Sequence, residues 1–148
     1  MKKFVFTNEK YQELKEKEDE RLKLNMKNVD KEIDMAAAAL HALDEKFNSE
    51  RSVFESACRH GVAAGELASY QGYFEFLQDR RKDATREMEA LLDRKRTLTE
   101  ALLRVNNELR VLEEMRQEQY QAYCKEVAAE EAKELDTHMA FTIIERAV

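Results

Sequence analysis

The side chains best suited to catalysis or metal binding are scattered along this sequence. His41, His60 and His138 lie far apart, and none has a carboxylate and a nucleophile at a spacing that would form a cleft. Cys58 and His60 have the look of two metal ligands, but helical positions this close project differently and no second pair exists. A glycine-rich phosphate-binding loop is also missing. We therefore predict no catalytic residue, no metal site, no cofactor and no enzymatic activity.

The charge of the chain argues against nucleic acid as a partner. Its 148 residues carry a net charge of -6 at pH 7. Two basic clusters, 80–82 and 94–96, are interleaved with acidic residues, so they form a solvated helix face and not the cationic patch that phosphate binding requires. The longest apolar run, Met35 to Leu40, is too short to cross a bilayer, and no signal peptide is recognisable. We expect a cytoplasmic protein with no membrane insertion.

The elements that must carry any site are two long amphipathic helices. Apolar residues recur at alternating steps of three and four, the heptad pattern that packed helices bury as a seam. In the first stretch the seam positions are Val29, Ile33, Ala36, Leu40, Leu43, Phe47, Glu50, Phe54 and Ala57. In the second they are Leu67, Tyr70, Phe74, Leu77, Arg81, Ala84, Met88, Leu91, Lys95, Leu98, Leu102, Val105, Leu109 and Leu112. Because a short turn joins the stretches, we predict an all-α fold, an antiparallel two-helix coiled-coil hairpin.

A single coiled-coil domain is expected to cover residues 1–148. Asn8 is a good helix cap, and Gly61 and Gly65 bracket the place where both seams end. The predicted bounds are about 8–60 for helix 1, 61–65 for the turn, 66–135 for helix 2, and a tail to 148 that overhangs helix 1. Near the start of helix 1 the seam is predicted to slip by one residue toward Leu14 and Tyr11.

Three charged residues interrupt the seams and are predicted to set the register: Glu50, Arg81 and Lys95. If the numbers of facing residues add up to 131, Glu50 faces Arg81, and the stem of Lys95 extends over the small Ala36. Sliding one heptad, to 124 or 138, leaves Glu50 opposite an apolar residue, and an unpaired charge in the seam is costly. We therefore predict the register of 131, with the turn centred just after Gly65.

Two groups of apolar side chains fall outside the seam. Tyr73 and Phe76 face outward near the turn. Either they form a docking patch for a partner, or Tyr73 flanks the core and Phe76 is a chance surface aromatic. The second group, in the overhanging tail, comprises Met139, Phe141, Ile143 and Ile144. This tail is either frayed or a segment that pairs only inside a partner.

Several segments resemble the FliJ family, the small stalk proteins of the bacterial flagellar type III export apparatus, which are related to YscO-type injectisome stalk proteins. These segments are Met1–Phe6, Tyr11–Glu18, Glu66–Tyr73 and Glu134–Asp136. The resemblance covers nearly the whole chain in length and layout, and its most specific part is the start together with the tyrosine-rich stretch after the turn. The chain departs from the family's pattern in its apolar ending from Phe141 to Val148 and in its acidic balance.

The resemblance implies a non-enzymatic stalk that inserts in the ring of a hexameric, FliI-like export ATPase and promotes its assembly and activity. It implies contact with a FlhA-like export gate protein, with export chaperones as further candidate partners. The family's gate-contacting surface lies early in the second helix and maps here onto Tyr73, Phe76, Leu77 and Arg80. The implied location is cytoplasmic, peripherally associated with the inner-membrane export apparatus, and the end carrying both termini enters the ATPase ring.

Two alternatives stay open: the chain is an injectisome stalk protein, or it is a self-associating structural coiled coil or prefoldin-like holdase. A parallel dimer would set Arg81 against Arg81 and Lys95 against Lys95 in the seam, an arrangement that like charges disfavour. We therefore expect the isolated chain to be a monomeric hairpin.

Overall fold

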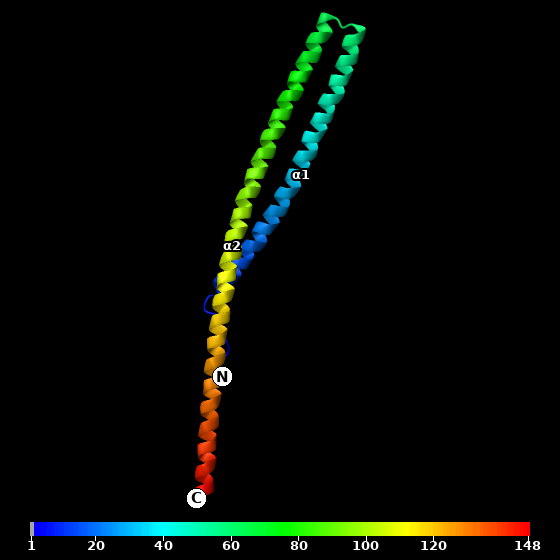
Figure 1. Cartoon of the computed structure of the whole chain (residues 1–148). Coiled ribbons are helices and arrows are strands. Elements are labelled where there is room, and N and C mark those ends of the chain that lie inside the picture. Colours follow the sequence, from blue (N-terminus) through cyan, green and yellow to red (C-terminus); the bar gives the residue numbers. More distant parts are fainter. Residues whose placement is uncertain (1) are drawn as a thin grey trace. The chain divides into compact units, whose positions relative to one another are not determined.

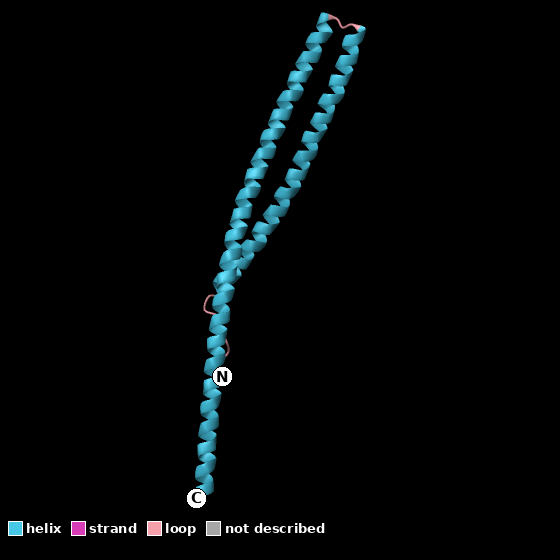
Figure 2. Ribbon diagram, in the orientation of Figure 1, coloured by secondary structure: helices cyan, strands magenta, loops and turns pink. Residues whose placement is uncertain are grey.

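The computed structural model describes residues 2–148, and almost all of them are helical (Figure 2). Helix α1 covers Glu9–His60 and helix α2 covers Ala64–Ala147. No strand occurs among residues 2–148. The two helices pack against each other, which confirms the predicted all-α helical hairpin.

The chain divides into two compact units, whereas the sequence predicts one domain. Unit 1 contains the N-terminal stretch up to Glu20 together with Leu103–Val148, and unit 2 contains Arg21–Leu102. In each unit a stretch of α1 runs antiparallel to a stretch of α2. In unit 2, for example, the cyan part of α1 lies beside the green part of α2 (Figure 1).

The turn of unit 2 is short and is fixed by a glycine. Helix α1 ends at His60, and Gly61 adopts a φ of 90°, the left-handed conformation that favours glycine directly after a helix. The amide of Gly61 donates to the carbonyl of Cys58 over 3.4 Å, which closes the last turn. Helix α2 then begins at Ala64, so the connection consists of residues 61–63 and Gly65 already lies in the first turn of α2.

The core of unit 2 follows the predicted seam. Every predicted position from 29 to 57 on α1 is buried or half-buried, and Val29 is completely buried. On α2 the predicted positions over 67–102 are also buried or half-buried, apart from Leu67 and Arg81. The heptad pattern therefore identifies the packed faces of both stretches.

Two ion pairs between the helices show the register of unit 2. Arg81 Nε lies 2.7 Å from Asp44 Oδ1, and Lys95 Nζ lies 2.7 Å from Asp30 Oδ1. In both pairs the residue numbers add up to 125, so the helices are shifted by about one heptad from the predicted register of 131.

The predicted Glu50–Arg81 pair is therefore wrong. The ring of Phe74 lies 5.5 Å from that of Phe47 and 5.6 Å from that of Phe54, one helical turn to either side of Glu50. Glu50 thus faces an aromatic ring, the arrangement that the prediction rejected. The prediction fails because an arginine or lysine stem is long enough to leave the seam and reach an acid beside it, so Arg81 needs no acid directly opposite.

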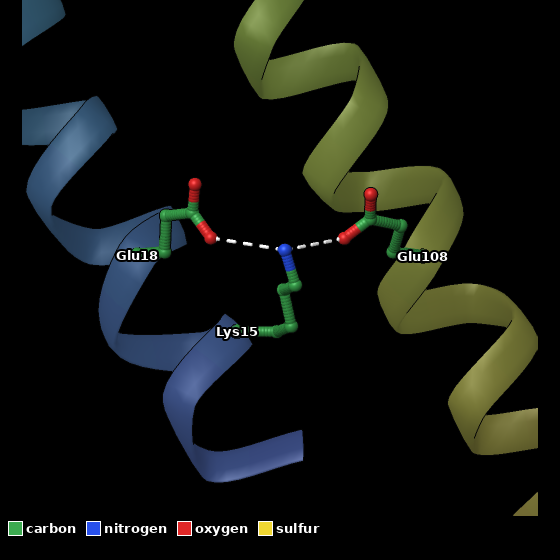
Figure 3. Close-up of polar contacts among 3 residues, drawn as sticks. All are labelled: Lys15, Glu18 and Glu108. Carbon is green, nitrogen blue, oxygen red and sulfur yellow. Dashed lines mark hydrogen bonds and ion pairs between the residues drawn. The ribbon is translucent and has the colours of Figure 1, made fainter. Parts of the chain in front are cut away.

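In unit 1 a lysine at a seam position binds two carboxylates (Figure 3). Lys15 Nζ lies 2.6 Å from Glu108 Oε2 on α2 and 3.2 Å from Glu18 Oε2 on α1. The hydrogen bonds to Glu108 and then Glu18 raise the pKa of Lys15 above its ordinary value of 10.5. The lysine therefore stays charged and links the two helices of this unit.

The seam of unit 1 is polar on its α1 side. Gln12 is half-buried and donates to Glu113 Oε2 over 3.2 Å, and Asp19 is buried. Leu14 and Tyr11, by contrast, are 64% and 49% exposed. The predicted slip toward Leu14 and Tyr11 is wrong, because polar side chains that find partners keep the original 3-4 spacing.

Residues 2–8 continue unit 1 as an extended segment along α2. The hydroxyl of Tyr123 donates to the carbonyl of Lys2 over 2.7 Å, and Thr7 donates through its amide and hydroxyl to Gln119 Oε1 over 3.3 and 3.2 Å. Phe6 is buried, with 4% of its surface exposed. The segment therefore takes the place of helical turns that α1 lacks.

Beyond this segment, the end of α2 is helical but uncovered. From residue 124 to 148 every side chain except Val127 and Thr142 is exposed. The exposed large apolar residues here are Leu135, Met139, Phe141, Ile143, Ile144 and Val148. The helix runs twelve residues past the predicted end near 135, up to Ala147.

Candidate partner-binding surface

An exposed aromatic patch lies on α2 within unit 2, in the part predicted to bind a partner. Tyr73, Phe76 and Arg80 follow each other at steps of three and four, so they share one face of the helix. The rings of Tyr73 and Phe76 stack with centroids 6.3 Å apart and planes 24° apart. The guanidinium carbon of Arg80 lies 5.7 Å from the centroid of the Phe76 ring, within the range of a cation–π contact. We call these three residues the aromatic patch.

The patch offers apolar area that the fold leaves open. Phe76 is 54% exposed, Arg80 is exposed and Tyr73 is half-buried. Stacking orders the side chains before any partner arrives, which lowers the entropy lost on binding. Aromatic and arginine side chains are also those that most often dominate binding energies at interfaces.

Leu77, the fourth residue that the resemblance assigns to this surface, belongs to the core. Only 3% of its surface is exposed. Since Leu77 sits at a seam position, its side chain packs between the helices and is closed to a partner in this conformation. Leu77 is therefore a core residue that supports the part of α2 carrying the patch, and the prediction that it lies on the partner-binding surface is corrected.

A layer of aromatic rings supports the patch from below. Phe74 contacts both Phe47 and Phe54 across the helices, as the register requires, and Phe54 also contacts Tyr70 with centroids 5.1 Å apart. Since these rings come from both α1 and α2, they hold the start of α2 in place. The patch is therefore carried by a packed part of the helix.

An open groove adjoins the patch and shares Tyr73 with it. The groove has a volume of about 400 Å³ and is lined by Glu50, Glu66, Ser69, Tyr70 and Tyr73. Glu50 comes from α1 and the other four from the first turns of α2. Glu50 is half-buried and forms no ion pair with any residue of the described part of the chain, 2–148. Sequence reasoning missed this groove because it paired Glu50 with Arg81.

The sequence signal for the true ion pairs was present but indirect. Asp44 and Asp30 each directly follow a seam position of α1, and they stand at the same offset from Arg81 and Lys95. That shared offset would have identified the register. Arg81 and Lys95 therefore do join the two helices, through partners that differ from the predicted ones.

The residues considered for catalysis and metal binding do not assemble. His41 Nε2 contacts Glu45 Oε1 at 3.0 Å on the exposed face of α1, and His60 Nδ1 lies 2.9 Å from the carbonyl of Ser56. Cys58 and Cys124 are both free and exposed. Among residues 2–148, no group of three or more His, Cys, Asp or Glu side chains could hold a metal ion. Neither helix contains an apolar stretch long enough to cross a membrane, as far as residues 2–148 are concerned.

The comparison with known families gives a match over nearly the whole chain. A family model described as the flagellar FliJ protein matches residues 9–147, a span that includes both helices, the turn, the aromatic patch and the groove. No match is found among curated proteins or among solved structures.

Proposed function

Because the chain belongs to the FliJ family of flagellar proteins, we propose that it is a non-enzymatic stalk of the flagellar type III export apparatus. The family match over residues 9–147 carries this proposal, and it confirms the family predicted from the sequence. The flagellar role is preferred to an injectisome role because the matching model is that of a flagellar protein. In this role the chain joins an export ATPase ring to an export gate and catalyses no reaction itself.

The aromatic patch is proposed to bind the FlhA-like gate protein. Its support is the exposure of Phe76 and Arg80 on a helix held by the aromatic layer beneath. Burying such rings in a partner gains apolar contact without unfolding any part of the core. The gate would therefore read a surface that exists before binding.

The uncovered end of α2 is proposed to enter the ring of the FliI-like ATPase, promoting its assembly and hydrolysis. Its support is the set of exposed apolar residues that follows Tyr123, including Met139, Phe141 and Ile144. A single helix inside a sixfold ring contacts the subunits unequally, and such differential contacts are what any coupling requires. Export chaperones remain further candidate partners.

Gate binding is tested with the double variant Tyr73→Ala, Phe76→Ala and a purified, cognate FlhA-like protein. We expect affinity to fall at least about tenfold, the equivalent of about 1.4 kcal/mol. Leu92→Ala is the matched control, because Leu92 is an exposed apolar residue of α2 outside the patch, 47% exposed. Equal affinity of the double variant and the control would refute this role of the patch.

Ring contact is tested by adding the chain to a cognate export ATPase. We expect faster ATP hydrolysis and more assembled ring, measured by phosphate release and electron microscopy. An ATPase that neither assembles nor hydrolyses faster would refute the stalk role. Sedimentation of the isolated chain addresses the alternative of a structural coiled coil, since a concentration-independent dimer would favour that class over a 17.4 kDa monomer.

A further inference from the structure

Glu50 is the seam residue whose charge the fold leaves uncompensated. It is half-buried, faces the ring of Phe74 between Phe47 and Phe54, and has no ion-pair partner within residues 2–148. Its carboxylate lines an open groove, where a positive charge from outside the chain can reach it. An apolar residue at this seam position would pack better, so folding alone does not explain the acid.

The groove around Glu50 combines two carboxylates with two tyrosines, whose rings present aromatic faces and whose hydroxyls can donate or accept hydrogen bonds. Glu50 and Glu66 supply carboxylates, and Tyr70 and Tyr73 supply phenol rings. Ser69 donates its own proton to the carbonyl of Gly65 over 3.2 Å, so its oxygen has only lone pairs left to offer. No lysine or arginine lines the groove. Its negative charge and its carboxylate acceptors therefore favour a cation that carries hydrogen-bond donors.

A guanidinium group fits this combination better than an ammonium ion. It carries five N–H donors and no acceptor, it forms paired hydrogen bonds with one carboxylate, and it stacks on aromatic faces. A groove of about 400 Å³ open to solvent is large enough to admit one side chain from outside. We propose that this groove binds an arginine side chain of a partner polypeptide.

The aromatic patch gives the bound segment a direction. Tyr73 belongs to both the groove and the patch, and Arg80 lies at the far end of the patch, about 10 Å further along α2. Because Arg80 repels a second cation, the segment places its arginine at Glu50, apolar side chains on Phe76, and neutral or acidic residues near Arg80. The placement of this segment on the gate protein rests on the proposed function, whereas the arginine preference of the groove does not.

The preference is tested by nuclear magnetic resonance on the isotope-labelled full chain, with N-acetyl-arginine-N-methylamide as the probe. The citrulline analogue is the neutral probe of the same shape. We expect arginine to shift the amide signals of Glu50, Ser69, Tyr70 and Tyr73 at millimolar concentration, and citrulline to leave them in place. Equal shifts with both probes would overturn the proposal.

Variants separate the groove from the general acidity of the chain. Glu50→Gln should weaken arginine binding at least about fivefold, the equivalent of about 1 kcal/mol. Glu75→Gln is the control, because it removes the same charge from an exposed position of α2 outside the groove. Unchanged binding in Glu50→Gln, or an equal loss in both variants, would overturn the proposal. Circular dichroism should show the same helix content in all three proteins.

Binding to the gate protein distinguishes this inference from the proposed function. If the natural chain binds the gate and Glu50→Gln weakens binding more than Glu75→Gln does, both are supported. If the two variants bind the gate equally well, the proposal that an arginine of the gate protein occupies the groove is overturned, while the proposed function stands. If the gate does not bind at all but the arginine probe still depends on Glu50, the gate role fails and the groove stands.

Discussion

Replacing Glu50 with leucine should make the protein more stable. Glu50 occupies a seam position beside Phe74, where it is half-buried and without an ion-pair partner in the described chain. Full burial of a leucine side chain contributes about 1.5–3 kcal/mol, so half-burial contributes about 1 kcal/mol. We therefore expect a gain of about 1 kcal/mol, from the added apolar contact alone.

The gain is measured as a shift in thermal unfolding followed by circular dichroism at pH 7. For a chain of this size, 1 kcal/mol corresponds to about 2–4 °C in Tm, so Glu50→Leu should melt about 2–4 °C higher. Glu75→Leu is the control, since its exposed position on α2 gains no core contact and should change Tm by less than about 1 °C. A lower Tm for Glu50→Leu would show that the carboxylate contributes to folding, and the reasoning would fail.

The same variant should lose the arginine preference of the groove. Glu50→Leu removes the carboxylate from α1 and leaves Glu66 as the remaining acid of the groove. Stability and binding are thus expected to change in opposite directions, which is common where a polar group is kept for function. If Glu50→Leu is more stable but binds arginine as well as the natural chain does, the proposal that Glu50 gives the groove its arginine preference is contradicted.

Three further predictions concern the core and the ion pairs. Leu77→Ala should lower the free energy of unfolding in urea by about 2–4 kcal/mol, because the side chain is 3% exposed. Phe76→Ala should lower it by less than about 1 kcal/mol, because Phe76 is 54% exposed, and similar losses in the two variants would contradict the assignment of Leu77 to the core and Phe76 to the patch. Asp44→Asn should cost no more than about 1 kcal/mol, because its pair with Arg81 is partly exposed, and 1 M NaCl should abolish the difference; a larger, salt-independent loss would argue against this. Raising the pH from 7 to 10 should leave the ion pairs of Lys15 in place, because the pKa of Lys15 is raised in the folded state. The stability that this shift provides is complete below the ordinary pKa of 10.5 and is lost only as the pH rises through the pKa of the folded state. Opening of the helices of unit 1 by pH 9, seen as a loss of hydrogen-exchange protection, would contradict this prediction.

The fold was predictable because the heptad pattern is a local property repeated many times. Each seam residue indicates independently which face of the helix is buried, so exceptions such as Leu67 and Arg81 do not change the predicted fold. The patch was predictable for the same reason, since Tyr73 and Phe76 are defined by their distance from the seam. The family could be identified from the start of the chain and from the tyrosine-rich stretch after the turn, and the match over 9–147 agrees.

The register was not predictable from the seam because a heptad repeat is satisfied equally well after a shift of seven residues. The choice then rests on a few polar residues and on the turn. The prediction assumed that Glu50 and Arg81 must face each other. Arg81 instead extends beside the seam and forms an ion pair with Asp44 of α1. Helix α1 ends at His60, close to its predicted end, but α2 begins at Ala64, before Gly65, so the turn is centred earlier, in agreement with the observed register.

Polar residues in the seam therefore separate into two kinds, and the separation indicates where function lies. Arg81, Lys95 and Lys15 each find an acid on the opposite helix, so their charges are explained by the joining of α1 to α2. Glu50 finds none and lines instead a groove beside the stacked rings of Tyr73 and Phe76, of which Phe76 is exposed. A charge that the fold does not use, placed next to apolar surface that the fold does not cover, is best explained by a partner that supplies the opposite charge and covers the apolar surface.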